Sequence, residues 1–148
     1  MLVLPLKVGD EMYAVGIDKI KEVIPVVEIR PLPESPDYMK GLINYRGTVS
    51  PVIDLCMLIK GYESKYFLST RIVMIDFEGE FCSFGLIAEQ VTETINIDTD
   101  EIHSIAKGLS NAGYIQNTII KDGKIIQLLN PKKIFSEKIT IFQVDNTI

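Results

Sequence analysis

Apolar and polar residues alternate with a period of two along most of this chain. That alternation is typical of β-strands with one buried face, and turn residues between two such runs predict a hairpin. We expect hairpins that turn at Gly9–Glu11, Arg46–Gly47, Glu78–Glu80 and Asp122–Gly123. Asp-Gly between β-prone runs is a strong hairpin signal because both positions tolerate positive φ. The chain is therefore predicted to be mainly β, with short helices.

One stretch breaks the alternation. In residues 17–24, the side chains of Ile17, Ile20 and Ile24 recur at helical spacing. This pattern predicts a short helical turn, ended by Pro25 because the residue preceding a proline disfavours the helical conformation.

Short helices and single strands fill the remaining spaces between the hairpins. A helix over residues 55–61 has Asp54 as its N-cap and Gly61 as its C-cap. A C-terminal helix over 131–138 begins with Pro131. The other expected segments are a strand at 26–29, a proline-rich connector at 30–38, a strand at 91–97, a helical turn within 98–108, and an edge strand or tail at 139–144.

The order of these elements repeats along the chain. The hairpin turn at Gly9 recurs about 70 residues later at Gly79, and the turn at Gly47 recurs about 76 residues later at Gly123. Each half contains, in this order, a hairpin, a single strand, a second hairpin and a short helix. Two barrels of about five strands, related by a pseudo-twofold axis, fit this repeat because closing a sheet removes its exposed edges. Two cores of that size cannot be covered separately, so we expect the barrels to share an apolar seam.

We expect residues 1–148 to form a single domain made of two intertwined barrel subdomains. Their approximate ranges are 15–70 and 75–135, and the terminal segments could be exchanged between them.

Composition narrows the class of partner. The chain is 47% hydrophobic and carries a net charge of −5, which fits a globular protein and argues against nucleic acid or an anionic membrane surface. The whole excess of negative charge lies in residues 75–148, so the halves could face different neighbours, or the bias is random.

No apolar run is long enough to span a membrane. Cys56 and Cys82 lack zinc-ligand spacing and favour reduced thiols over a disulfide.

The sequence offers little catalytic chemistry. His103 is the single histidine and lies in an acidic stretch, which favours a solvated surface residue over a base or a metal ligand. Asp76, Glu78 and Glu80 alternate along a hairpin and are more simply read as facing solvent than as an acid–base pair or a weak Ca²⁺ site. We therefore predict no catalytic residue, no metal site and no cofactor, and a module that binds other proteins.

Residues 41–55 carry a more specific pattern. The segment reads Gly, apolar residues, Asn-x-Arg-Gly, then apolar-x-Pro-apolar-apolar-Asp-Leu, and it resembles the signature of CheW-like domains. Further similarity covers 8–25, 85–97 and 112–134, so the resemblance extends over essentially the whole chain. The positions that match the signature are Asn44, Arg46, Gly47, Pro51, Asp54 and Leu55.

This resemblance implies two SH3-like β-barrels of about five strands each and a non-catalytic scaffold of bacterial chemotaxis. Such adaptors join the helical cytoplasmic tips of chemoreceptors to the regulatory domain of the histidine kinase CheA. The resemblance therefore implies a cytoplasmic protein that is recruited to membrane-associated receptor arrays without inserting into the membrane.

Receptor-binding roles follow from matching positions in the family. Arg46 matches the arginine associated with receptor coupling, and its fork of donors suits carboxylates or carbonyls at a helix tip. Gly41 and Gly47 match glycines near the same surface, where a missing Cβ lets a partner helix approach, although turn geometry alone suffices for Gly47. Ile29 and Ile43 match apolar positions that line a receptor groove between the barrels.

Kinase-binding roles follow in the same way. Leu4, Ile17 and Ile20 match apolar positions in the family's kinase-facing patch on the first barrel. For these three residues, and for the two receptor-groove isoleucines, burial in the core is the competing interpretation.

Two residues depart from the family pattern. Tyr45 replaces the usual aliphatic residue before the signature arginine, and Asn130 replaces the common aspartate near the end of the second half. Two alternative functions stay open. One is a homologous adaptor in another receptor–kinase pathway, such as surface motility or gene regulation, and the other is a small-ligand-binding β-barrel.

Overall fold

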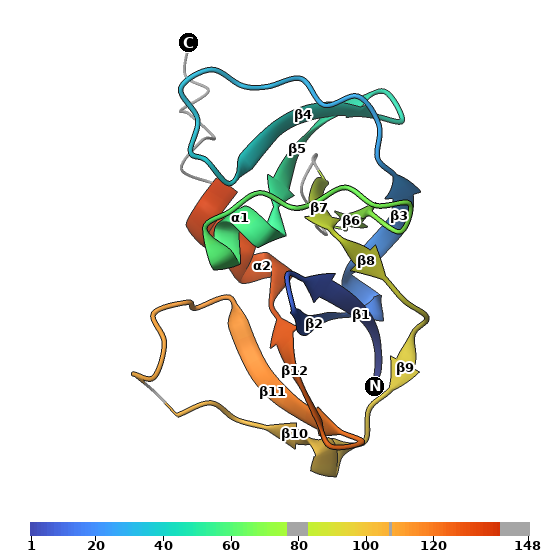
Figure 1. The fold of residues 1–148 in the computed structure, drawn as a ribbon, viewed down its shortest axis with the longest axis vertical. Helices are drawn as coiled ribbons and strands as arrows, with labels where there is room; N and C mark the ends of the chain where they lie inside the picture. Colours follow the sequence, from blue (N-terminus) through green and yellow to red (C-terminus); the bar gives the residue numbers. More distant parts are fainter. Residues whose placement is uncertain (77–82, 107, 140–148) are drawn as a thin grey trace.

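The computed structural model describes residues 1–76, 83–106 and 108–139, and these form two curved β-sheets that lie against each other (Figure 1). The central sheet has the strand order β3-β6-β7-β5-β4. Its strands are β3 (Ile20–Pro25), β4 (Met39–Tyr45), β5 (Thr48–Asp54), β6 (Arg71–Ile75) and β7 (Phe84–Ala88).

The terminal sheet joins the beginning of the chain to its second half. Its order is β10-β11-β12-β2-β1-β8, with β9 also pairing β1. Its strands are β1 (Leu2–Val8), β2 (Glu11–Gly16), β8 (Gln90–Val91), β9 (Ile95–Asn96), β10 (Ile102–His103), β11 (Ile115–Lys121) and β12 (Lys124–Leu129).

The two sheets have matching topologies. The order β3-β6-β7-β5-β4 corresponds strand by strand to β8-β1-β2-β12-β11, and in each sheet the only parallel pair among these strands is the third with the fourth, β7 with β5 and β2 with β12. The remaining pairs are antiparallel in both sheets. The internal repeat predicted from the sequence is therefore present in the strand pairing.

Each repeat is divided between the two sheets. The chain passes from β2 in the terminal sheet to β3, which pairs β6 in the central sheet, and later from β7 in the central sheet to β8, which pairs β1 in the terminal sheet. The subdomain ranges 15–70 and 75–135 stay a prediction. The sheets themselves divide differently along the chain, because β6 and β7 belong to the central sheet and β1 and β2 to the terminal one.

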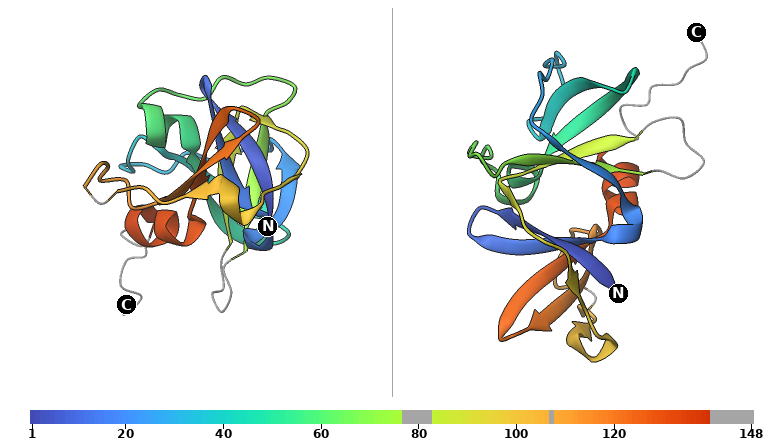
Figure 2. Two further views of the ribbon diagram at one scale, coloured as in Figure 1. Left: turned by 90° about the horizontal axis from the view of Figure 1, so that it is seen from below. Right: turned by 90° about the vertical axis from the view of Figure 1, so that its right-hand side faces the viewer.

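Three hydrophobic clusters hold the structure together. One lies within each sheet, and the third, the seam core, joins both sheets to the helices. In Figure 2 the hairpin of β1 and β2 lies between the hairpin of β11 and β12 and the central sheet. Strands β1, β2, β6 and β7 bury both faces, one in their own sheet and one in the seam core, which explains their nearly continuous apolar sequences. Members of the seam core include Leu6, Tyr13, Val15, Leu55, Val73, Leu86 and Phe135.

Both helices of the repeat lie beside the seam (Figure 1). Helix α1 (Leu55–Lys60) follows β5 and starts at Asp54, whose carboxylate accepts hydrogen bonds from the backbone of Cys56 and Met57. Helix α2 (Pro131–Ile134) follows β12, has Asn130 at the equivalent cap, and continues into a π-helical turn, η3 (Phe135–Ile139). The mainly β class, the two sheets and the C-terminal helix are confirmed.

Residues 17–25 differ from the prediction. Only Ile17–Lys19 form a helical turn, the 3-10 helix η1, and β3 begins at Ile20. The predicted helical turn is therefore present but does not extend to Pro25, because the β-branched residues Val23 and Ile24 find ladder partners on β6, and such tertiary pairing outweighs a weak helical spacing.

The strand expected at 26–29 is also absent. After Pro25 the chain leaves β6 and meets β4 at one isolated bridge, between Arg30 and Leu42. The expected turn within 98–108 is present as η2 (Thr99–Glu101), whereas the expected strand at 91–97 is split between β8 and β9. The predicted hairpin turn at 78–80, Cys82 and nearly all of the segment 139–144 lie outside the described residues.

Candidate partner-binding surface

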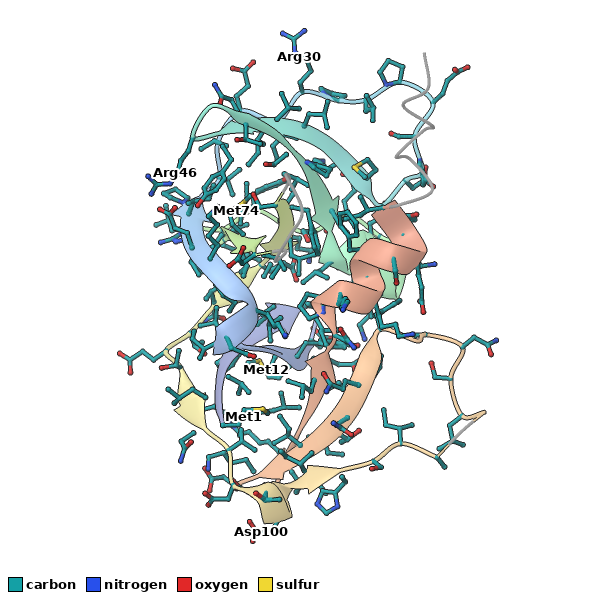
Figure 3. The ribbon with its side chains drawn as sticks, turned by 180° about the vertical axis from the view of Figure 1, so that it is seen from behind. Met1, Met12, Arg30, Arg46, Met74 and Asp100 are labelled. Atoms are coloured by element: carbon teal, nitrogen blue, oxygen red, sulfur yellow. The ribbon has the colours of Figure 1, made fainter. Side chains whose placement is uncertain are left out.

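Arg46 occupies the tip of the hairpin formed by β4 and β5. Arg46 and Gly47 both have positive φ, 50° and 82°, as in the two-residue turns that match the twist of paired strands. The Oδ1 atom of Asn44 accepts a hydrogen bond from the Gly47 amide at 2.9 Å, which fixes the turn. Figure 3 shows Arg46 on the outside of the molecule, beside the blue ribbon of β3.

The guanidinium of Arg46 is held by Glu22 on β3. The Oε1 atom of Glu22 accepts hydrogen bonds from Arg46 Nη2 at 2.8 Å and Nε at 3.0 Å, and from the Tyr45 hydroxyl at 2.6 Å. The Arg46 side chain is still 70% exposed. A partner can therefore reach a guanidinium whose orientation is already fixed.

The hydrogen bonds among Glu22, Tyr45 and Arg46 bridge an opening in the central sheet. Strands β3 and β4 are its two end strands, and no ladder pairs them within the described residues. Glu22 lies on β3, whereas Tyr45 ends β4 and Arg46 follows it. The side-chain hydrogen bonds thus join the two edges of the sheet at the place where main-chain bonds are missing.

The hydrogen bonds among Glu22, Tyr45 and Arg46 also shift the pKa values of these groups. Hydrogen bonds from Tyr45 and Arg46 lower the pKa of Glu22, and the bond to Glu22 raises the pKa of Arg46. Burial, followed by the bond to Glu22, raises the pKa of Tyr45. At neutral pH the group therefore contains a carboxylate, a neutral phenol and a guanidinium. Lys21 Nζ lies 5.7 Å from the Tyr45 ring centroid, so the local charge is positive and suits a partner that presents carboxylates or carbonyls.

A shallow hollow continues this surface away from the turn. It has a volume of about 300 Å³ and is lined by Val27, Glu28, Arg30, Leu42 and Asn44. Val27 is exposed, and Figure 3 shows Arg30 pointing away from the body of the protein. We call Arg46 and the residues that line this hollow the Arg46 face. It combines exposed aliphatic area with two arginines.

The other predicted receptor-binding residues lie behind this face. Ile43 is buried in the core of the central sheet, and Ile29 is half-buried against the same core. Gly41 is also buried, and a Cβ there would clash with the carbonyl oxygen of Arg30. The chain therefore needs glycine at this position for its own packing. The partner-binding roles of these three residues stay predictions.

The three predicted kinase-binding residues differ in exposure. Ile17 is exposed, Ile20 is half-buried against the seam core, and Leu4 is buried within that core. The register of β1 and β2 pairs Val3 with Gly16, which places the exposed Leu2 next to Ile17. Ile17 and Leu2 are therefore adjacent exposed apolar residues, whereas Leu4 and Ile20 belong to the seam core or pack against it.

A second hollow, of about 380 Å³, lies between the β1–β2 turn and the loop after α1. Its most buried acidic residue is Glu89, whose carboxylate already accepts hydrogen bonds from the backbone amides of Gly9 and Lys65. These two hydrogen bonds join the β1–β2 turn to the loop after α1, so the Glu89 carboxylate has a structural role. Within the described ranges, no group of three or more histidines, cysteines and carboxylates could hold a metal ion. In the same ranges no helix is both long and apolar enough to cross a bilayer.

Glu22 is not among the site residues predicted from the sequence. The helical interpretation of residues 17–24 turned attention away from the period-two pattern, in which Glu22 and Ile24 share the less exposed face of a strand. A charged residue next to an isoleucine on such a face was the available signal, because an acid at a half-buried position needs a donor.

Comparison with known proteins gives a consistent result. The model of the CheW-like domain family matches residues 2–138. The chemotaxis protein CheW of Treponema pallidum is 24% identical over 136 residues, covering 89% of this chain and 80% of that protein. That of Helicobacter pylori is 27% identical over 131 residues, covering 88% and 78%. The crystal structure of the scaffolding protein TtCheW from Thermoanaerobacter tengcongensis superimposes with a TM-score of 0.78 at 27% identity, covering 86% of this chain and 82% of that one.

Proposed function

The chain belongs to the CheW-like domain family, and from that premise we propose that it is a non-catalytic adaptor that couples chemoreceptors to the histidine kinase CheA in bacterial chemotaxis. The family match over residues 2–138 carries this proposal. Support comes from relatives named chemotaxis protein CheW and from a structural neighbour named a scaffolding protein.

The Arg46 face is the proposed receptor-binding surface. A chemoreceptor tip is a helical hairpin, and a guanidinium can donate to carboxylates or to the free carbonyls at the end of a helix. Val27 and Leu42 supply apolar area beside it, as in the docking of an amphipathic helix into a groove. Ile29, Ile43, Gly41 and Gly47 hold this surface in shape.

The proposed kinase-binding surface lies at the end of η1. Ile17 presents apolar area to the regulatory domain of CheA, and Ile20 and Leu4 support it from the seam core. Because this surface and the Arg46 face use different residues, one molecule can hold both partners at once. The protein would then reside at the cytoplasmic tips of membrane-bound receptors.

Binding of a receptor-tip fragment to the Arg46→Ala variant tests the receptor side of this proposal. We expect the affinity to fall about tenfold or more, because a charge-assisted pair with good geometry is lost. Binding to the regulatory domain of CheA should stay unchanged. Calorimetric titrations of both fragments would measure the two affinities.

Lys124→Ala is the matched control. Lys124 is an exposed cation beside the equivalent hairpin turn of the terminal sheet, so its loss removes the same charge at a distant site. Wild-type protein that binds neither fragment would refute the coupling function. Equal losses for both variants would mean that only the overall charge matters.

A further inference from the structure

Tyr45 combines a buried ring with a hydroxyl at the surface. Its side chain alternates inward with Ile43 along β4 and packs in the core of the central sheet, leaving the residue 6% exposed. The hydroxyl nevertheless reaches the opening between β3 and β4, where it donates to Glu22. The core therefore fixes the position of this donor.

The side chains of Glu22 and Arg46 are not fixed by packing in the core as the Tyr45 ring is. Both have long side chains, and that of Arg46 is largely exposed. An exposed ion pair is weak by itself because ordering two flexible side chains offsets most of the attraction. A tyrosine has only two side-chain torsions, and here its ring is already ordered by packing. Its hydrogen bond can hold the carboxylate in one place at little further entropic cost.

We propose that the Tyr45 hydroxyl is a positioning group for Arg46. It holds the Glu22 carboxylate at the opening between β3 and β4, and through that carboxylate it fixes the guanidinium in the orientation offered to an acceptor-bearing helix tip. The inference rests on the proposed receptor-binding function of Arg46. The aliphatic residue usual at this position in the family could fill the same core but could not donate a hydrogen bond to Glu22. This way of positioning Arg46 is therefore a feature of this chain.

Tyr45→Phe is the decisive variant because it keeps the ring and removes only the hydroxyl. We expect the variant to fold, and its affinity for a receptor-tip fragment to fall about threefold to tenfold, the cost of ordering one or two side chains on binding. Affinity for the CheA regulatory domain should not change.

The carboxyl of Glu22 provides a readout that a merely structural role would not move. The charged or titratable groups that face it are Tyr45, Arg46 and Lys21. Because the Tyr45 hydrogen bond lowers the pKa of Glu22, its removal should raise that pKa toward the ordinary value. Carbon-13 NMR of the carboxyl group during a pH titration measures this shift in wild type and variant.

Tyr114→Phe is the control. Tyr114 is 7% exposed and packs in the seam core, so the variant removes a hydroxyl from an equally buried tyrosine far from Arg46. Its receptor affinity and the Glu22 pKa should equal those of the wild type.

The outcomes separate this inference from the proposed function. Wild-type receptor affinity in Tyr45→Phe, together with a large loss in Arg46→Ala, would overturn the positioning role alone. Absence of receptor binding by the wild type would overturn both. If Tyr45→Phe fails to fold, the wild-type titration decides, because an ordinary pKa for Glu22 would mean that the hydroxyl does not hold the carboxylate.

Discussion

At the scale of single residues, one carboxylate oxygen organises the proposed receptor-binding surface. Glu22 Oε1 accepts three hydrogen bonds, from Tyr45 and twice from Arg46. Glu22 lies on β3, Tyr45 at the end of β4 and Arg46 in the turn that follows, so these residues meet only in the folded protein. Arg46 and its turn could be predicted from the sequence motif, whereas Glu22 could not, because its place beside the turn is set by how the two sheet edges approach each other.

Gly41 illustrates a residue whose role is internal. Its φ is 149°, a conformation available almost only to glycine, and a Cβ would meet the Arg30 carbonyl. Arg30 and Leu42 exchange two main-chain hydrogen bonds of 2.9 Å at this place. Glycine therefore allows the connector after β3 to lie against β4.

Gly41→Ala should lower the free energy of unfolding by about 2–4 kcal/mol, because the added methyl group forces the Arg30 backbone away. Gly47→Ala is the control, since a Cβ there meets nothing within 4 Å and only the positive φ is unfavourable. That variant should lose about 1–2 kcal/mol. Urea denaturation measures both losses, and equal losses would show that the contact with Arg30 is unimportant.

At the scale of elements, the two helix caps show how far the repeats have diverged. Asp54 caps α1 and also binds the loop that follows it, through the Ser64 amide at 3.0 Å and the Ser64 hydroxyl. Asn130 occupies the equivalent position before α2 and accepts one hydrogen bond, from Lys133 at 3.3 Å. The buried aspartate therefore fixes both a helix and a loop, and the asparagine fixes only a helix.

Asp54→Ala should destabilise the protein by about 2–4 kcal/mol, combining loss of the cap with buried donors left unpaired at Ser64. Asn130→Ala should cost about 0.5–1 kcal/mol, because only the cap is lost. Thermal unfolding followed by circular dichroism gives both values. A loss at position 130 as large as that at position 54 would contradict this difference between the repeats.

Most elements could be predicted from the sequence, and the exceptions have physical causes. The hairpins at Gly9, Arg46 and Asp122 were predicted because glycine-containing turns and alternation are local signals. The helical turn predicted within residues 17–24 extends too far because the strand partner of this segment, β6, lies about fifty residues further along the chain. Local periodicity contains no information about such a partner.

At the scale of the whole molecule, exchange of strands makes the two sheets dependent on each other. Strand β3 completes the central sheet although it follows the first hairpin of the terminal sheet, and β8 does the reverse. The seam core adds apolar contacts from both sheets and both helices. The repeat, the seam and the possibility of exchanged segments could be predicted from the sequence, but not which strands cross, because equivalent hairpins offer equivalent partners.

This architecture suits a rigid spacer between two partners. The Arg46 face lies on the opening of the central sheet, whereas Ile17 lies where the chain crosses from β2 to β3. A rigid body between them would keep the receptor and the kinase at a fixed separation, which is what a coupling adaptor requires.

Sedimentation velocity of the protein with a receptor-tip fragment and the CheA regulatory domain together is the most direct test of coupling. The wild type should form one complex that contains all three components, and Arg46→Ala should retain the kinase domain while losing the receptor fragment. A wild-type protein that binds each partner only in the absence of the other, or binds neither, would contradict its assignment as the adaptor between them.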